Sequence, residues 1–231
     1  MEGRLEATAL TDEEKLVDAW ALACVKSRAN ILEDGTYCMT PLLDMINHDC
    51  SISTKAEMLN TDAGDKALEL NVRGKGFKAG EEVFMSYGDM TNLDTLCNYG
   101  FVAPENPCNV ECLDVRLILS PEPIKVGIAS DGTIAVEALA LLRRLLANGA
   151  EIKGRNQLSD FMEPISENNE LEVVSFLATE MDMSAKDARR GALEAATVRE
   201  DKMVKTYLST RAATLEKGIE SIKVRYPDLE Y

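Results

Sequence analysis

The stretch Asp44-Met45-Ile46-Asn47-His48-Asp49-Cys50 decides how the fold of this chain is interpreted. It holds the only histidine among 231 residues, next to an asparagine that no helix or strand pattern requires. Ser86-Tyr87-Gly88 follows later, at the end of an apolar run, and Asn98-Tyr99-Gly100-Phe101 comes after that. The histidine lies within residues 34–66, which are rich in Asp, Asn, Ser, Thr and Gly. Because a long irregular segment in a compact domain is usually functional or disordered, Asn47 and His48 are candidates for a site.

The composition indicates an ordinary globular protein, with enough chain for one large domain or two small ones. Apolar residues make up 45% of the chain and charged residues 28%. No stretch approaches the roughly 18 consecutive apolar residues of a membrane span, and the acidic N-terminal region shows no apolar signal segment. We therefore expect a protein that neither spans a membrane nor carries a visible export signal.

The formal net charge is −15, and the acidic residues are spread along the chain. Such a surface disfavours nucleic acid and anionic membranes and favours a partner with a basic face, although the acidity can also serve solubility alone. Among six cysteines, Cys108 and Cys112 are four apart, but no second pair and no nearby histidine completes a tetrahedral zinc set. We expect no metal site, and reduced, mostly buried thiols in an intracellular protein.

The order of expected elements divides the chain into a loop-rich part and a helical part. In the first part, Thr11 and Glu14 form a capping-box pattern before a helix that ends near Arg28 or Asn30. The remaining expected elements of this part are a strand over 82–87, a helix over 91–98 closed by Gly100, and a strand over 110–119. In the second part we expect helices over 134–147, closed by Asn148-Gly149, over 169–181, and over 184–224, kinked or divided at Gly191 and Gly218.

The motifs around His48 and Tyr87 resemble the second half of a SET domain, and most closely the Rubisco large-subunit methyltransferase family. Ser27-Arg28 after a tryptophan-bearing helix and Leu-Leu-Arg-Arg-Leu-Leu at 141–146 match the same family. Asn98-Tyr99-Gly100-Phe101 also matches it, and we expect this run mainly to pack against Tyr87 and hold it in place. The resemblance implies an α+β fold, namely a partial SET β-fold with a pseudoknot-type active site over 1–102 and an all-α substrate-binding domain over 103–231. The Gly-x-Gly strand of SET domains comes early in the domain, so we interpret Gly74-Lys75-Gly76 as a hairpin turn.

This resemblance implies a protein-lysine N-methyltransferase that uses S-adenosyl-L-methionine. It makes Tyr87 the catalytic residue and a cofactor contact, with Asn47 and His48 holding the adenine and amino-acid ends of the cofactor. It makes Arg28 the partner of the cofactor carboxylate and places Asp44 along both the cofactor and the lysine channel. A tyrosine hydroxyl suits this chemistry because it offers oxygen acceptors to the transferred methyl without titrating near neutral pH, its reference pKa being about 10.

The substrate side of the site is expected to use Ser27, Asn30 and Asp44. The family often has an aromatic residue where this chain has Asn30, which makes the acceptor pocket more polar, so histidine stays open as an alternative methyl acceptor. The expected partner is a protein with an accessible lysine on a basic surface, and neither nucleic acid nor membrane. We expect a monomer in the plastid stroma, cytoplasm or nucleus, with the compartment left open.

Plainer interpretations of the same residues remain. Tyr87 can be a core tyrosine at a strand end, and Arg28 a surface arginine favoured by the helix dipole. The chain as a whole can be a non-catalytic module that binds a basic partner, or a truncated gene product. Because the sequence shows no early Gly-x-Gly strand, we expect weak or no cofactor binding by this chain alone.

Overall fold

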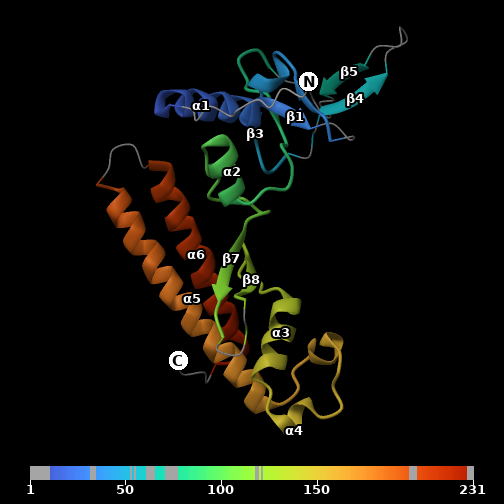
Figure 1. The fold of residues 1–231 in the computed structure, drawn as a ribbon, viewed down its shortest axis with the longest axis vertical. Coiled ribbons are helices and arrows are strands. Elements are labelled where there is room, and N and C mark those ends of the chain that lie inside the picture. The colour runs from blue at the N-terminus through green and yellow to red at the C-terminus, as the bar shows by residue number, and fades with distance from the viewer. Residues whose placement is uncertain are drawn as a thin grey trace, which may run out of the picture. The chain divides into compact units, whose positions relative to one another are not determined.

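The computed structural model describes residues 11–31, 35–52, 54, 56–60, 66–70, 78–117, 120, 122–197 and 202–227. These residues form two compact units, Met1–Gly88 and Asp89–Tyr231. Unit 1 contains α1 (Asp12–Arg28), β1 (Ala29–Ile31), β2 (Tyr37–Met39), η1 (Leu43–Met45), β3 (Asn47–His48), β4 (Ala56–Asn60), β5 (Lys66–Leu70) and β6 (Phe84–Met85). Unit 2 contains α2 (Asn92–Tyr99), β7 (Val110–Val115), β8 (Ile124–Ala129), α3 (Val136–Leu146), α4 (Gly149–Ile152), η2 (Leu158–Phe161), α5 (Glu167–Ala195) and α6 (Lys202–Arg225) (Figure 1).

The expected α+β class is confirmed, with small sheets in unit 1 and mainly helices in unit 2. The segment 89–102, which the sequence assigns to the first domain, is packed within unit 2. Compact units are defined by contacts within the chain, so this division does not test the family boundary near residue 102, which stays a prediction.

Helix α1 begins and ends where the sequence predicts. The Thr11 side chain accepts a hydrogen bond from the Glu14 backbone N–H, and the Glu14 carboxylate accepts from the Thr11 backbone N–H, so the capping box is present. No residue of α1 is buried, and its largest apolar side chains are open to solvent, with Leu16 71% and Trp20 68% exposed. Packing therefore contributes little to this helix, and its cap and propensity matter more.

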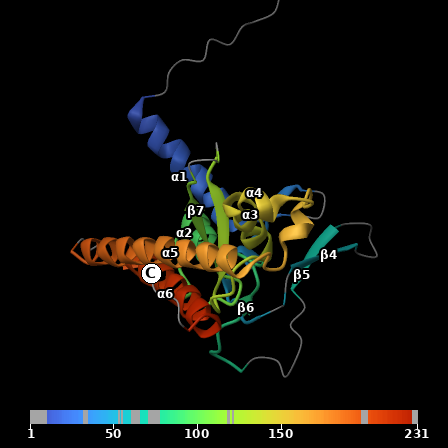
Figure 2. The same ribbon diagram turned by 90° about the horizontal axis from the view of Figure 1, so that it is seen from below.

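Three two-stranded sheets organise the rest of unit 1. Strand β1 pairs with β2 and β4 with β5, both antiparallel, and the β4–β5 hairpin can be followed in Figure 2. Strand β3 pairs with β6 in parallel, in the register Asn47↔Phe84 and His48↔Met85. The strand expected over 82–87 is thus confirmed only at its centre. The expected turn at Gly74-Lys75-Gly76 lies outside the described residues.

The core of unit 2 is a β-hairpin packed against helices. In β7 and β8 every second side chain is buried, among them Val115, Val126 and Ile128, and these pack with apolar side chains of α3, α5 and α6. Strand β8 was not predicted. Glu111 lies on the buried face of β7 with Leu113 and Val115, so its neighbour Cys112 lies on the exposed face. The buried Glu111 carboxylate forms a 2.8 Å ion pair with Arg211.

The helix boundaries in unit 2 correct the sequence prediction at two points. Asn148 does not close α3; its side chain caps the N-terminus of α4 by accepting from the N–H groups of Ala150 and Glu151. Helix α5 runs unbroken from Glu167 to Ala195, so the predicted break between 181 and 184 is wrong. The run predicted over 184–224 is divided, but not at either glycine: α5 ends at Ala195 and α6 begins at Lys202, so Gly191 and Gly218 both lie inside helices. Both lie where α5 and α6 pack closely, and a Cβ at Gly191 would lie 3.1 Å from Leu208.

No helix of the described residues is long and apolar enough to cross a membrane. None of the six cysteines is disulfide-bonded, and none is buried: Cys97 and Cys112 are exposed and the others are partly covered. The expectation of mostly buried thiols is therefore wrong.

Candidate active site

Segment 40–48 of unit 1 carries three of the seven predicted site residues, namely Asp44, Asn47 and His48. It begins with a turn in which the Asp44 N–H donates to the Thr40 carbonyl, 3.0 Å away. Leu42, within this turn, is the one non-glycine residue with a positive φ, +75°, among those the structure describes. Its side chain is 79% exposed, so packing does not explain the conformation. Strain of this kind costs about 1–3 kcal/mol and gathers at functional sites, which supports a functional assignment for the segment.

Tyr87 is fixed to this segment at both its backbone and its side chain. The parallel β3–β6 pair brings Asn47-His48 beside Phe84-Met85, and Tyr87 follows two residues beyond the pair. The Tyr87 hydroxyl donates a 2.7 Å hydrogen bond to the Ile46 carbonyl oxygen. Since the hydroxyl proton is used in that bond, the hydroxyl oxygen makes any further contact as an acceptor.

His48 acts on Tyr87 through its side chain. The Tyr87 backbone N–H donates to His48 Nδ1 at 3.0 Å, and the two rings lie with centroids 5.2 Å apart, tilted by 34°. An Nδ1 that accepts carries no proton, so the neutral ring holds its proton on Nε2. Burial lowers the pKa of His48, more than the Met85 backbone and the Asp49 carboxylate raise it. The neutral imidazole is therefore favoured, and it positions Tyr87.

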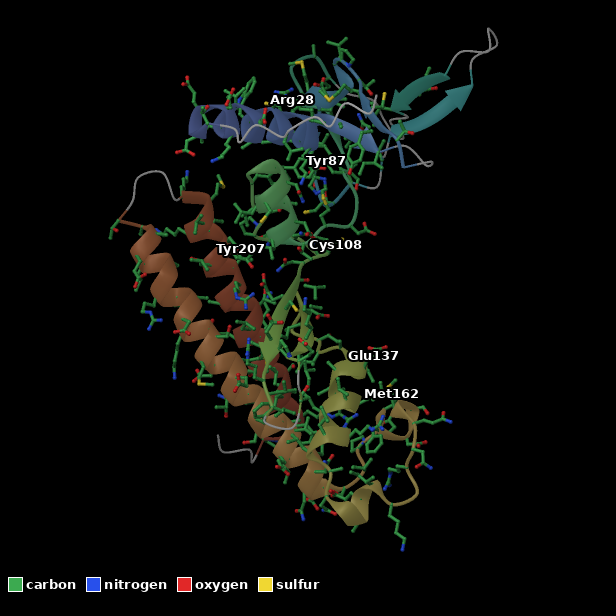
Figure 3. All side chains as sticks on the ribbon, viewed as in Figure 1. Arg28, Tyr87, Cys108, Glu137, Met162 and Tyr207 are labelled. Carbon is green, nitrogen blue, oxygen red and sulfur yellow. The ribbon has the colours of Figure 1, made fainter. Side chains whose placement is uncertain are left out.

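Arg28 and Asp44 form an ion pair between the end of α1 and η1. Arg28 Nη1 lies 3.3 Å from Asp44 Oδ2. The Asp44 side chain is mostly covered, 14% exposed, whereas the Arg28 side chain is 51% exposed (Figure 3 labels Arg28 and Tyr87). Asp44 is two residues before Ile46, whose carbonyl oxygen accepts from the Tyr87 hydroxyl. A guanidinium and a carboxylate side by side match the carboxylate and ammonium of an amino-acid zwitterion.

The Asn47 side chain has a hydrogen-bond partner in Glu82. Its Nδ2 donates to Glu82 Oε1 over 2.6 Å. Glu82 comes two residues before Phe84, the residue that faces Asn47 in the β3–β6 pair. No sequence pattern marks Glu82, because the contact exists only after the two strands pair.

The two remaining predicted residues lie near the Arg28 end of the site. Ser27 donates its hydroxyl to the Cys24 carbonyl at 3.3 Å, a bond within α1, so its side chain is used locally. Asn30 Nδ2 lies 3.5 Å from the Thr40 hydroxyl, across the β1–β2 pair. Asn30 is thereby linked to the turn that ends at Asp44, whereas Ser27 contacts no other predicted site residue among the described contacts.

The structure thus gathers Arg28, Asp44, Asn47, His48 and Tyr87 around segment 40–48. Their individual roles stay predictions. Asn98-Tyr99-Gly100-Phe101, expected to pack against the tyrosine, belongs to unit 2, where Gly100 is the left-handed C-cap of α2. Within the described residues, no group of three or more His, Cys, Asp or Glu side chains could hold a metal ion.

Sequence comparison points to methyltransferases. No protein-family model matches the chain. It is 26% identical over 244 residues to the actin-histidine N-methyltransferase of Gallus gallus, covering 91% of this chain and 38% of that protein. It is 27% identical over 252 residues to the enzyme of the same name from Otolemur garnettii, covering 89% of this chain and 40% of the relative. The chain therefore spans about two fifths of the length of these relatives.

Two solved structures share the fold. One is the SET domain of LSMT bound to lysine and AdoHcy, with a TM-score of 0.62 and 17% identity over 96% of this chain and 58% of that one. The other is Rubisco LSMT bound to sinefungin and monomethyllysine, with a TM-score of 0.63 and 18% identity over 96% of this chain and 57% of that one. The predicted resemblance and the predicted fold are confirmed.

Proposed function

We propose that this chain, which shares its fold with SET-domain structures of the Rubisco large-subunit methyltransferase type, is part of an S-adenosylmethionine-dependent protein methyltransferase. Tyr87 is the catalytic residue of this proposal. Arg28, Asp44, Asn47 and His48 bind the cofactor or position the residues that do.

One observation carries the proposal: the parallel pairing of β3 with β6, which joins Asn47-His48 to Tyr87. A parallel pair needs a long crossover, so this pairing is not a local hairpin. It fixes the tyrosine by its backbone N–H on His48 and by its hydroxyl on Ile46. A core tyrosine at a strand end needs no such double attachment.

The charged groups of the site fit the amino-acid end of the cofactor. In this proposal the Arg28 guanidinium binds the carboxylate, as a planar donor fork does well, and the Asp44 carboxylate favours the ammonium. In the structure the two side chains pair with each other at 3.3 Å. Binding therefore exchanges one ion pair for two, which offsets part of the cost of opening it.

The cofactor, when bound, supplies a sulfonium methyl that is transferred in line to a nitrogen; the S–CH3 bond breaks, an N–CH3 bond forms, and the acceptor nitrogen releases a proton to solvent. Tyr87 supports this step with its hydroxyl oxygen, which can only accept because its proton is held by Ile46. An oxygen acceptor stabilises partial positive charge on the methyl in the transition state. His48 keeps Tyr87 in place without adding a charge, since its neutral form is favoured.

The acceptor is proposed to be lysine or histidine on a partner protein with a basic face. Lysine is supported by the fold, because the solved neighbours carry lysine or monomethyllysine. Histidine is supported by the names of the sequence relatives and by Asn30, whose amide offers polar contacts near the turn that holds Asp44. The net charge of −15 supports a basic partner.

Cofactor binding can be tested on the chain as it stands. His48 is the only histidine, so its ring C–H signals in an NMR spectrum need no further assignment. We expect S-adenosylhomocysteine to shift these signals in a saturable way, with a dissociation constant in the millimolar rather than the micromolar range. Adenosine monophosphate, which lacks the amino-acid end, is the ligand control.

Arg28→Ala should weaken this binding by a factor of about ten or more, because a hydrogen-bonded charge pair is lost. Lys26→Ala is the matched control: it removes the other basic side chain of the last turn of α1 and should leave the binding unchanged. The proposal fails if the wild-type signals do not move, or if both variants lose affinity equally.

A further inference from the structure

The contact between Asn47 and Glu82 fixes which end of an amide faces the candidate site. At 2.6 Å from Nδ2 to Oε1, the bond has the short length of a charge-assisted hydrogen bond. Its partners are 35 residues apart, and the β3–β6 pair holds both backbones. Both side chains are exposed, so a ligand can reach them.

The orientation of the Asn47 amide follows from the chemistry of Glu82. An asparagine carries a donor and an acceptor of nearly the same shape, so its two orientations usually differ little in energy. An ionised carboxylate only accepts hydrogen bonds. Glu82 therefore selects the orientation in which Nδ2 faces it, and the Asn47 carbonyl oxygen faces away from Glu82.

We propose that Glu82 is a positioning residue that turns the Asn47 carbonyl oxygen toward an N–H donor of the bound cofactor. This inference rests on the proposed function and deepens it. The cofactor offers N–H donors at its adenine amino group and at its α-ammonium. With Arg28 engaged by the cofactor carboxylate, an acceptor at Asn47 complements the remaining donors, whereas the reversed amide would present N–H against N–H.

The decisive variant is Glu82→Lys. A lysine only donates, so it holds the Asn47 carbonyl oxygen and turns Nδ2 toward the ligand. We expect Glu82→Lys to weaken S-adenosylhomocysteine binding at least about tenfold, the effect of losing a hydrogen bond to a charged or strongly polar group. Glu82→Gln keeps an acceptor for Nδ2 and should stay within about threefold of wild type.

Glu81→Lys is the matched control, with the same change of charge one residue away. Glu81 accepts from the Lys78 backbone N–H at 2.8 Å and has no contact with Asn47 among the described hydrogen bonds. The affinity of Glu81→Lys for S-adenosylhomocysteine should also stay within about threefold of wild type, because a change of charge alone at this exposed position has little effect.

Two further measurements make the test independent of enzyme activity. The side-chain amide protons of Asn47 should show one strongly hydrogen-bonded signal in wild type and in Glu82→Gln, and not in Glu82→Lys. Two ligand analogues identify which N–H group of the cofactor binds the Asn47 carbonyl oxygen: S-inosylhomocysteine lacks the adenine amino group, and 5′-methylthioadenosine lacks the α-ammonium. The analogue that lacks the group in contact with Asn47 should bind wild type and Glu82→Lys with equal affinity.

The outcomes separate this inference from the proposed function. Equal affinity of wild type and Glu82→Lys, or equal loss in Glu82→Lys and Glu81→Lys, overturns the positioning role and leaves the function standing. An equal loss in Glu82→Gln overturns it too, since the amide orientation would then not be what matters. A wild-type chain that ignores S-adenosylhomocysteine overturns the function and this inference together.

Discussion

The buried ion pair of unit 2 gives the sharpest stability prediction. Arg143 on α3 and Glu170 on α5 are joined by two hydrogen bonds, Nε–Oε2 at 2.6 Å and Nη2–Oε1 at 2.9 Å, with side chains only 2% and 5% exposed. Arg143 also donates to the carbonyls of Phe161 and Met162, and the Tyr226 hydroxyl donates to Glu170. Glu170→Gln keeps the shape of the side chain but removes its charge.

The expected loss for Glu170→Gln is about 3 kcal/mol in the free energy of unfolding. Removing one partner of a buried pair costs about 3–5 kcal/mol, because the other charge stays buried without compensation. The lower end applies here, since the carbonyls of Phe161 and Met162 still accept from Arg143 and a glutamine oxygen keeps one bond. Urea unfolding followed by circular dichroism measures this difference.

The control for this variant is Glu216→Gln, which removes the same charge from an exposed pair with Arg189. Such a pair contributes about 0–1 kcal/mol, so the midpoint of unfolding should hardly move. A loss for Glu170→Gln below about 1 kcal/mol, or no larger than the control, would refute the reasoning.

The same pair should make stability depend on acid. Burial raises the pKa of Glu170, but hydrogen bonds from Arg143 and Tyr226 lower it more, so the net pKa lies below the ordinary value of 4.5. A carboxyl group with a lowered pKa in the folded state stabilises it above the unfolded pKa, and this is lost as pH falls through the folded pKa. Below pH 4.5 the wild type should therefore lose more stability than Glu170→Gln.

Three further predictions concern single residues. Gly132→Ala should cost about 1–3 kcal/mol in unfolding free energy, because φ is +90° and a Cβ would lie 2.6 Å from the Lys217 carbonyl oxygen; Gly154→Ala, with a similar φ and open space, should cost less, and equal losses would contradict this. Thr91→Ala should cost about 0.5–2 kcal/mol by removing the N-cap of α2, and an unchanged unfolding midpoint would count against the cap. Trp20, the only tryptophan, should fluoresce like free tryptophanamide and be quenched fully by acrylamide, whereas a blue-shifted, protected emission would contradict its 68% exposure.

The features that the sequence predicted well are those that depend only on residues close together along the chain. The Thr11–Glu14 capping box and the Gly100 C-cap are encoded within one turn of helix, and both are confirmed. The predicted role of Asn148 was wrong, because a glycine or asparagine in a helical pattern can end a helix, begin one or permit close packing. The predicted break near residue 183 was wrong too, in a stretch that contains neither glycine nor proline. Gly191 permits packing, and only the contact with Leu208 on α6 reveals this.

For the candidate site, the sequence predicted which residues come together but not their contacts. Arg28, Asp44, Asn47, His48 and Tyr87 were found through family motifs, which carry the result of a tertiary arrangement in a short sequence. What each side chain contacts could not be predicted. His48 was expected on the cofactor, yet its Nδ1 accepts from the Tyr87 backbone N–H. Glu82 was missed, because its bond to Asn47 depends on the β3–β6 register.

Methyl transfer under single-turnover conditions tests the central claim most directly. The chain, in excess over S-adenosylmethionine with a labelled methyl group, is mixed with basic peptides whose only acceptor is lysine or histidine. We expect slow, measurable transfer to one of the two sets, and a loss of about a hundredfold or more in Tyr87→Phe, the usual scale for removing one transition-state acceptor or donor. Tyr37→Phe, at an exposed tyrosine of β2, is the control and should transfer at the wild-type rate. Transfer by Tyr87→Phe at the wild-type rate, or no transfer by the wild type to either set, would contradict the claim.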